Sequence, residues 1–154
     1  MKVNSVRKEL NQIMELENLS PKIIKLNDLQ KKEWLKQMQA TRSPWHKPQY
    51  DIHAIISDKK YLGGIVLNHK PHTQIYQKHN LKIDIAITFF FVLKKIRQQG
   101  WGKKLINIPL KKYKRIGLTT NTGETTSPAY ALYKKSGFKK IDSKGKAEYW
   151  YWNK

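Results

Sequence analysis

A glycine-bearing turn flanked by cations lies near the middle of the chain. The run Val92-Leu-Lys-Lys-Ile-Arg97-Gln-Gln-Gly100-Trp-Gly102-Lys103 separates a β-branched, aromatic segment from an apolar-faced segment around Leu105. Glycine allows backbone N–H groups to approach an anion closely. The first turn of a following helix presents further unpaired N–H groups and the positive end of its dipole. These residues therefore predict a loop that binds phosphate, with Arg97, Lys103 and Lys104 adding positive charge.

The spacing of the two glycines excludes two other kinds of phosphate loop. A Walker loop needs Gly-Lys-Ser/Thr at a fixed position, and the dinucleotide fingerprint needs G-x-G-x-x-G; the turn has neither pattern. A glycine pair two residues apart also occurs in ordinary tight turns between a strand and a helix. A turn without a ligand is therefore the alternative interpretation of the glycines taken alone.

A second motif follows about thirty residues later. The segment Ala129-Tyr-Ala-Leu-Tyr133-Lys-Lys-Ser-Gly137-Phe138 predicts a helix that ends at a glycine. In this order and at this separation, the two motifs resemble the acetyl-CoA-binding half of the GCN5-related N-acetyltransferase (GNAT) family. The resemblance covers residues 83–141 well and the N-terminal third only by the order of its elements.

The resemblance implies acetyl-CoA as cosubstrate and no metal. It implies that the backbone at the end of strand 83–92 contacts the pantetheine and the acyl carbonyl, and that residues 98–103 surround the pyrophosphate. The cofactor-binding residues carried over by position are Phe91, Val92, Arg97, Gln98, Gln99, Gly100, Trp101, Gly102, Lys103 and Thr126. It also implies that Tyr133 protonates the leaving thiolate, which suits a phenol; packing within an amphipathic helix is the alternative role.

Three positions depart from the family pattern. Thr126 replaces the asparagine that commonly precedes the closing helix, and Ala86 stands where many members have a catalytic glutamate. The interval after Gly102 is short and contains Pro109, which we expect to break or kink the helix there.

Asp84 is the candidate general base, because it shares a strand face with Ala86. Partial burial would raise its pKa toward the useful range. Between Lys59 and Gly123 it is the only acid among fourteen Lys or Arg residues, so an ion pair with Lys82 or Arg97 is the equal alternative. Solvent water could also serve as the base.

The function that the resemblance implies is transfer of an acetyl group from acetyl-CoA to a primary amine by direct attack in a ternary complex. No covalent enzyme intermediate is expected, because the chain contains no cysteine. The acceptor amine is not specified, although Trp34, Trp45, His46 and Tyr50 fall where the family builds its acceptor pocket, with core packing favoured for Trp34.

The strong positive charge suggests a second class of function. The chain carries 31 Lys and Arg against 11 Asp and Glu, a formal charge of +20. Such an excess attracts nucleic acids and other polyanions, although solvated surface lysines are an equally good explanation. The alternative is therefore a basic RNA-binding module that stacks bases on Trp101, Trp150 and Trp152, or an acetyltransferase whose acceptor is borne by RNA or the ribosome.

A metal site is disfavoured. His69, His72 and His79 are close in sequence, but neither cysteine nor a carboxylate accompanies them, and Pro71 indicates a surface loop. No segment reaches the ~20 apolar residues that a membrane-spanning helix needs, and the first thirty residues do not have the pattern of a secretory signal. We therefore expect a cytoplasmic protein without a membrane partner, as a monomer or a homodimer.

The elements that must position these residues form a mixed α/β order. We expect one GNAT-like domain over residues 1–154, with a mostly antiparallel central sheet of six to seven strands, about four flanking helices and a peripheral helix at 5–18. The other expected elements are strand 23–26, a helix capped by Asn27 or Asp28 that carries Leu29, Trp34, Leu35 and Met38 on one side, loop 41–49, hairpin 52–68 with a bulge or close contact at Gly63 and Gly64, loop 69–80, strand 83–92, a helix around 105–106, strand 115–120, helix 127–135, and strands 138–141 and 148–152.

Overall fold

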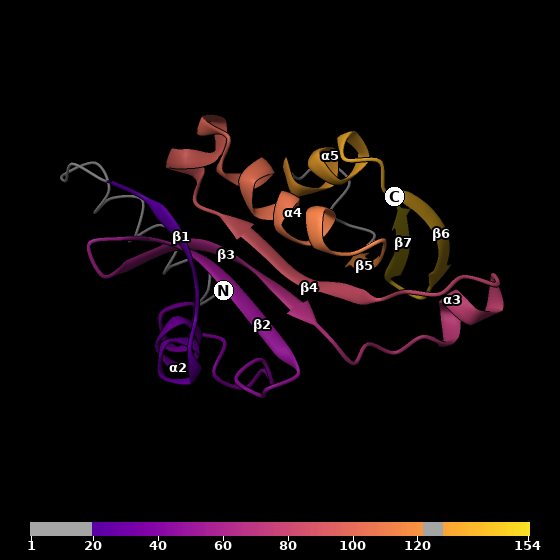
Figure 1. The fold of residues 1–154 in the computed structure, drawn as a ribbon, viewed down its shortest axis with the longest axis horizontal. Coiled ribbons are helices and arrows are strands. Elements are labelled where there is room, and N and C mark those ends of the chain that lie inside the picture. The colour runs from indigo at the N-terminus through magenta and orange to yellow at the C-terminus, as the bar shows by residue number, and fades with distance from the viewer. Residues whose placement is uncertain (1–19, 122–127) are drawn as a thin grey trace.

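The computed structural model describes residues 20–121 and 128–154, which form one twisted sheet with helices on both faces (Figure 1). The elements are β1 (Lys22–Lys25), α2 (Asp28–Gln37), β2 (Tyr50–Ser57), β3 (Lys60–Asn68), α3 (Gln74–Lys78), β4 (Ile85–Val92), the 3₁₀ helix η1 (Lys94–Gln99), α4 (Trp101–Lys112), β5 (Arg115–Asn121), α5 (Pro128–Lys135), β6 (Lys139–Lys144) and β7 (Ala147–Asn153). The helix predicted at 5–18 lies outside the described residues.

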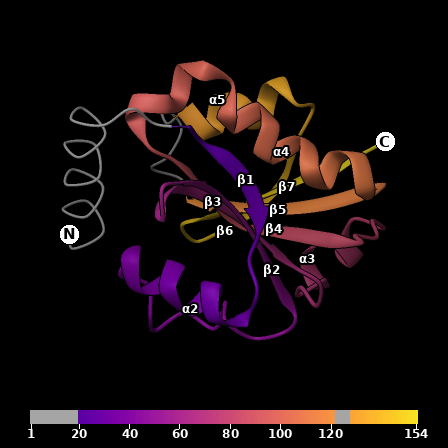
Figure 2. The ribbon, with the colours of Figure 1, turned by 60° about the vertical axis from the view of Figure 1, so that its left-hand side comes forward.

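The sheet confirms the predicted fold class. Its seven strands follow the order β1-β2-β3-β4-β5-β7-β6, and every neighbouring pair is antiparallel except β4 and β5. Helix α2 covers one face, while α4 and α5 cover the other (Figure 2). The buried core therefore has two layers, with Trp34 and Leu35 of α2 in one and Leu105 and Ile106 of α4 in the other. None of the described helices is both long and apolar enough to cross a bilayer.

Helix α2 begins where the sequence predicts, at a capping box. The Asn27 side chain accepts a hydrogen bond from the Gln30 backbone N–H at 2.9 Å, and the Gln30 side chain accepts one from the Asn27 N–H at the same distance. The predicted buried face is correct for Trp34, but Leu29 is 67% exposed. Leu29 precedes Trp34 by five residues, which turns it about 140° around the helix and away from the sheet.

The β2–β3 hairpin is also confirmed. Its two turn residues, Asp58 and Lys59, have φ angles of 48° and 65°, as a type I′ turn requires. A register shift between Ile55 and Ile56 leaves Leu62 of β3 without an opposite residue. This bulge lies directly before Gly63, in agreement with the bulge expected there.

The structure differs from two expectations about helices. The segment predicted as a loop at 69–80 contains the short helix α3. Pro109 does not break α4, which continues to Lys112, and the Pro109 carbonyl accepts a hydrogen bond from the Tyr113 N–H at 2.9 Å. A proline costs a helix one hydrogen bond, but the Pro109 ring is buried here, so packing offsets part of that loss.

The hydroxyl group of Tyr76 fastens α3 to the sheet. It accepts a hydrogen bond from the Leu118 N–H of β5 at 3.0 Å and donates one to the Trp150 carbonyl of β7 at 3.0 Å. Burial raises the pKa of Tyr76 to about 12. The hydroxyl thus bridges two adjacent strands at a pair of facing residues.

Replacing Tyr76 with phenylalanine is expected to destabilise the protein by about 1–3 kcal/mol, because a buried N–H and a buried carbonyl both lose this partner. Urea denaturation with an unchanged m-value measures the loss. The matched control is Tyr149→Phe, whose ring contacts Tyr76 at 6.5 Å and keeps that contact. Equal stability of Tyr76→Phe and the wild type would show that this bridge contributes nothing.

Candidate active site

Strands β4 and β5 run side by side only over their first residues. Ile85–Ile87 pair with Ile116–Leu118, and the pairing then stops. A register shift leaves Thr88 without a partner on β3, so β4 bulges at this residue. Beyond the bulge β4 stays paired with β3, and β5 stays paired with β7. The two strands therefore diverge and leave a gap in the sheet.

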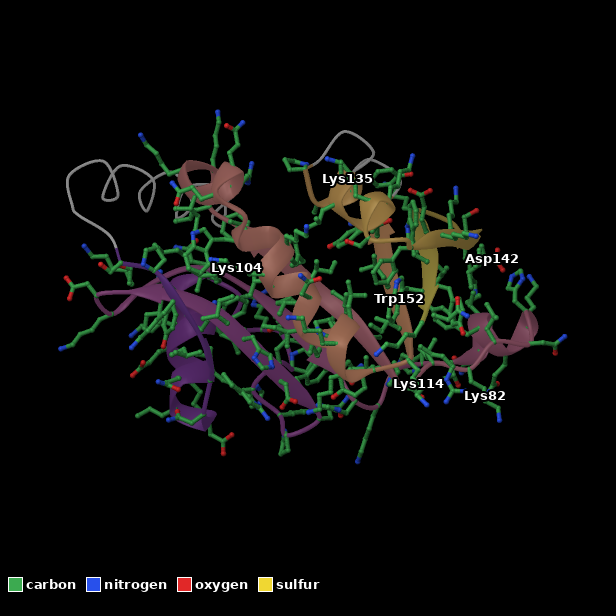
Figure 3. All side chains as sticks on the ribbon, turned by 45° about the horizontal axis from the view of Figure 1, so that its top comes forward. Lys82, Lys104, Lys114, Lys135, Asp142 and Trp152 are labelled. Atoms are coloured by element: carbon green, nitrogen blue, oxygen red, sulfur yellow. The ribbon has the colours of Figure 1, made fainter. Side chains whose placement is uncertain are left out.

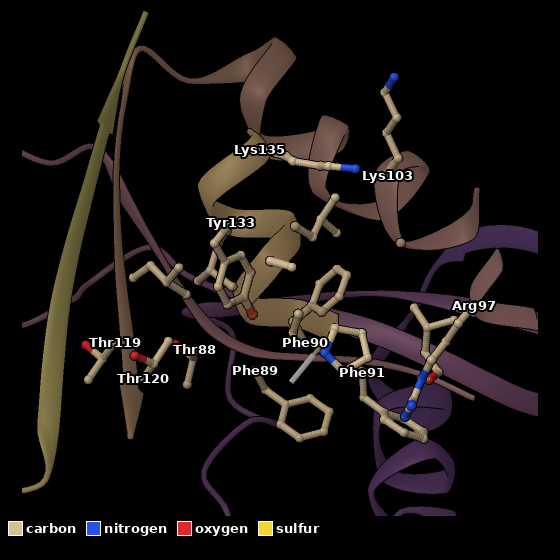
Figure 4. A pocket seen from close by; sticks show the side chains of 18 of the residues that line it. Thr88, Phe89, Phe90, Phe91, Arg97, Lys103, Thr119, Thr120, Tyr133 and Lys135 are labelled. Carbon is tan, nitrogen blue, oxygen red and sulfur yellow. Dashed lines mark hydrogen bonds between the residues drawn. The ribbon is translucent and has the colours of Figure 1, made fainter. Parts of the chain in front are cut away.

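The gap opens into a cleft of about 900 Å³. Its walls come from the second half of β4, the end of β5, η1, the first turn of α4, and α5 (Figure 4). The lining residues are Ile87, Thr88, Phe89, Phe90, Phe91, Val92, Arg97, Gly100, Gly102, Lys103, Leu118, Thr119, Thr120, Asn121, Pro128, Ala129, Ala131, Leu132, Tyr133 and Lys135. This volume is sufficient for a ligand of cofactor size.

The cleft reaches both faces of the sheet, because alternate residues of β4 point in opposite directions. The Phe90 ring packs against Tyr133 of α5, with ring centres 5.9 Å apart. The Phe89 ring packs on the α2 side, 5.7 Å from Trp34 and 5.1 Å from Trp45. Since both phenylalanines line the cleft, two molecules could meet in it from opposite faces.

Of the residues predicted for the acceptor pocket, Trp45 contacts the cleft through Phe89, and its side chain is half-buried. Trp34 is fully buried and donates a hydrogen bond to the Gly63 carbonyl at 3.3 Å, which matches the core role favoured for it. Tyr50 is buried in the core and His46 is exposed, and neither lines the cleft.

At one end of the cleft lies the N-terminus of α4. Gly100 caps this helix with a φ of 83°, a left-handed conformation that glycine adopts without strain. No side chain caps the helix, so its first N–H groups remain open toward an anion. Lys103 in the first turn is exposed, and Lys135 of α5 lies across the cleft mouth from it (Figure 4).

The structure brings together only part of the predicted cofactor set. Phe91, Val92, Arg97, Gly100, Gly102 and Lys103 line the cleft. Gln98, Gln99 and Trp101 lie in the same turn but outside the lining, and Thr126 lies outside the described residues. Lys104, also expected to face the phosphate, does not line the cleft. Lys135, Phe89 and Phe90 were missed by the sequence analysis. The apolar run after Asp84 predicts a strand, but no residue in the run indicates that the strand bulges at Thr88.

Arg97 faces the end of β4. Its Nε donates a hydrogen bond to the Val92 carbonyl at 2.7 Å, and its guanidinium lies 6.0 Å from the centre of the Phe91 ring. These contacts hold η1 against the strand. The remaining N–H groups of the guanidinium are the ones that could contact a phosphate.

Tyr133 lies in the wall of the cleft between β4 and the end of α5. Its ring packs against Phe90 and, at 6.1 Å, against Phe138. The helix ends at Gly137, whose φ is 98°, and the Phe138 N–H returns to the Tyr133 carbonyl at 3.1 Å. The helix thus ends at a glycine, as the second sequence motif predicts, and the C-terminal cap holds the backbone at Tyr133.

Asp84 does not have the environment predicted for a general base. It precedes β4 and lies about 20 Å along the strand from Phe90, which contacts Tyr133. Its carboxylate accepts hydrogen bonds from the Arg115 guanidinium at 2.8 Å and the Arg115 N–H at 3.1 Å. These bonds hold the pKa of Asp84 below its usual value, so the expected rise by burial is wrong. The ion-pair alternative is correct, with Arg115 as the partner in place of Lys82 or Arg97.

The three histidines of the predicted loop do not meet. His69 pairs with Asp51 at 2.6 Å, and His79 pairs with Asp142 at 2.8 Å at a different part of the sheet. No three His, Asp or Glu side chains among the described residues are arranged to hold a metal ion.

His53 of β2 provides a pH-dependent contribution to stability. Burial lowers its pKa, with Asp51 acting in the opposite direction. The unfolded chain therefore binds a proton at His53 more readily than the folded chain, and stability falls as pH drops below about 6.5. His53→Gln is expected to reduce the fall in Tm between about pH 7.5 and about pH 5.5. The exposed His72, changed to Gln, serves as control; an equal change in both variants would contradict this role.

The expectation of three stacking tryptophans is wrong for Trp150. Its ring is buried against Tyr130, with centroids 5.0 Å apart, and its Nε1 donates a hydrogen bond to the Thr120 hydroxyl at 2.9 Å. Trp101 and Trp152 are half-buried.

The sequence matches the model of one known protein family. The family model for the acetyltransferase (GNAT) family matches residues 10–138, most of the chain. The chain belongs to the GNAT family. This confirms the resemblance inferred from the two motifs, and it extends the match well into the N-terminal third. No curated protein matches the chain by sequence.

Solved structures show the same fold. PH1933 from Pyrococcus horikoshii OT3 is 21% identical with a TM-score of 0.64, and the match covers 88% of this chain and 99% of that one. Arabidopsis thaliana NAA60, in complex with acetyl-CoA, is 15% identical with a TM-score of 0.64 over 88% of this chain and 100% of its own. A putative streptothricin acetyltransferase from Bacillus anthracis, also in complex with acetyl-CoA, is 25% identical with a TM-score of 0.51. That match covers 70% of this chain and 64% of the streptothricin acetyltransferase chain. Two of these three GNAT-like structures thus hold acetyl-CoA.

Proposed function

We propose that this protein transfers the acetyl group of acetyl-CoA to a primary amine by direct attack in a ternary complex. The observation that carries the proposal is the cleft between the diverging strands β4 and β5, which joins an open helix N-terminus to Tyr133 and opens on both faces of the sheet. Family membership and the acetyl-CoA complexes of NAA60 and the putative streptothricin acetyltransferase support it.

In this proposal the first turn of α4 binds the pyrophosphate. Its open N–H groups, the helix dipole and the Lys103 ammonium all favour negative charge at that point. Lys135 adds a second cation from α5. After the bulge at Thr88, the edge of β4 that faces the gap is no longer paired with β5, so its backbone groups are available to the pantetheine and the acyl oxygen.

The reaction forms one bond and breaks one. The neutral amine nitrogen attacks the thioester carbonyl carbon and forms the C–N bond, the C–S bond breaks, and the acetyl group stays on the nitrogen as an amide while the CoA thiolate leaves. Tyr133 donates its phenolic proton to the departing thiolate, the amine loses its extra proton to water, and solvent returns a proton to the Tyr133 phenolate. Holding both reactants in one cleft supplies several kcal/mol of the rate enhancement.

No carboxylate or histidine occurs among the described residues that line the cleft. This supports water as the proton acceptor in place of a dedicated base. The absence of a lining acid in the described part also disfavours acceptors with several positive charges.

A thermal-shift measurement tests binding. Acetyl-CoA at about 100 times its Kd is expected to raise Tm by roughly 5–11 °C. Lys103→Glu should remove most of that shift without destabilising the helix, because an acid in the first turn suits the dipole. Lys47→Glu, on the loop after α2, makes the same charge change away from the cleft and should keep the shift.

A screen of primary amines with detection of free thiol tests the reaction itself. Acetyl-CoA-dependent thiol release that needs an amine is the expected result. Binding without thiol release for any amine, or an acetylated protein in single turnover, would contradict direct transfer. The cytoplasmic location, the single domain and the oligomeric state remain predictions.

A further inference from the structure

The charge of the described chain is unevenly distributed between the faces of the sheet. The acids of the described residues are Asp28, Glu33, Asp51, Asp58, Asp84, Asp142 and Glu148. None of these belongs to η1, α4 or α5. The cations of those three helices are Lys94, Lys95, Arg97, Lys103, Lys104, Lys111, Lys112, Lys134 and Lys135. These three helices therefore carry cations and no acid; Lys104 on α4 and Lys135 on α5 are labelled in Figure 3.

Elsewhere on the described chain, some cations lie beside carboxylates. Arg115 pairs with Asp84 at 2.8 Å, Lys140 pairs with Glu148 at 2.7 Å, and Lys78 lies 3.5 Å from Asp142. The lysines of α4 make no such ion pair with any described acid. We call Lys104, Lys111, Lys112 and Lys134 the basic face.

Aromatic rings hold three of the basic-face ammonium groups in place. Lys104 lies 4.1 Å from the centre of the Trp101 ring, Lys112 lies 5.5 Å from that of Tyr113, and Lys134 lies 4.9 Å from that of Tyr130. A cation–π contact orients an ammonium but does not cancel its charge, as a carboxylate would. These positive charges thus remain available to an external anion.

The basic face is separate from the acetyl-CoA site of the proposed function. Its four lysines are absent from the cleft lining, which includes Lys103 and Lys135 instead. Lys104 and Lys112 are eight residues apart on one helix, so the positive charge extends about 12 Å along α4 alone. One ligand at the mouth of the cleft would leave most of this charge unneutralised.

The chemistry of the face identifies its partner. Among the described residues, Leu29 is the one large apolar side chain that is exposed. It belongs to α2, which covers the opposite face of the sheet. The basic face therefore has no apolar group to insert into a bilayer and no large apolar anchor for a protein interface. A phosphodiester backbone needs only spaced cations. We propose that the basic face binds the phosphodiester backbone of a nucleic acid, independently of acetyl transfer.

Fluorescence anisotropy with a labelled single-stranded RNA, and with DNA of the same sequence, tests this proposal. The variant Lys104→Gln/Lys111→Gln/Lys112→Gln removes three charges from α4. Its control, Lys32→Gln/Lys36→Gln/Lys47→Gln, removes three charges from the α2 side. Both variants should keep the Tm shift with acetyl-CoA, which shows that each is folded.

The α4 variant is expected to bind about 100-fold more weakly at about 0.1 M salt, and the slope of log Kobs against log salt should fall by about two. The control should bind as the wild type does. Similar binding of RNA and DNA, or a preference for RNA through its 2′-hydroxyl groups, would support the proposal. Equal weakening in both variants, no binding near physiological salt, or equally tight binding of poly-glutamate would overturn it.

Discussion

Replacing Tyr133 with phenylalanine is expected to lower kcat for acetyl transfer by about 10²–10⁴-fold, the usual contribution of one general acid. The change removes a single oxygen. The ring keeps its contacts with Phe90 and Phe138, so the cleft wall and the fold should be preserved. Acetyl-CoA should therefore still raise Tm, because the pyrophosphate site proposed at α4 is untouched. The measurement is kcat with the best amine from the screen.

A matched change on the same helix separates chemistry from packing. Tyr130 belongs to α5 and is also buried, but it packs against Trp150 and does not line the cleft. Tyr130→Phe should leave kcat within a few-fold of the wild-type value. If Tyr133→Phe retained full kcat, or if both variants lost the same activity, the phenol of Tyr133 could not be the proton donor.

Elements that depend on local sequence were predictable. The Asn27 cap and the turn of the hairpin predicted over residues 52–68 need only side chains and dihedrals within a few residues, and both are present. The start of α4 at the Gly100 turn is local in the same sense. Because two such local motifs flank the cleft, the family and the general position of the site followed from sequence.

Features that depend on distant partners were not predictable. Helix α3 has five residues, and its anchor is a pair of hydrogen bonds from Tyr76 to residues 42 and 74 positions away. Asp84 and Arg115 are 31 residues apart, so sequence offered no reason to prefer that pair over Arg97. The divergence of β4 from β5 depends on a bulge at Thr88, which reflects pairing with β3 and has no glycine to mark it.

Gly63→Ala is expected to destabilise the protein by about 3 kcal/mol or more. This is the upper end of the loss in stability that an extra methyl group causes in a well-packed core. A Cβ at Gly63 would lie 2.4 Å from the Phe91 carbonyl oxygen, closer than real Cβ contacts. The obstacle is backbone in the middle of the sheet, so no rotamer change can relieve it. Strand β4 must move away from β3 at the residues that pair Gly63 with Val92.

This displacement should also weaken acetyl-CoA binding, because Phe91 and Val92 line the cleft. Urea denaturation and the thermal shift with acetyl-CoA measure the two losses. Gly145→Ala is the control: its φ is 60° and nothing lies within 4 Å of the added carbon, so it carries only the left-handed strain of about 1–2 kcal/mol. Gly145→Ala should keep its acetyl-CoA shift. If Gly63→Ala were as stable as the wild type and bound acetyl-CoA equally well, the close approach of β3 to β4 would not determine the position of the cleft wall.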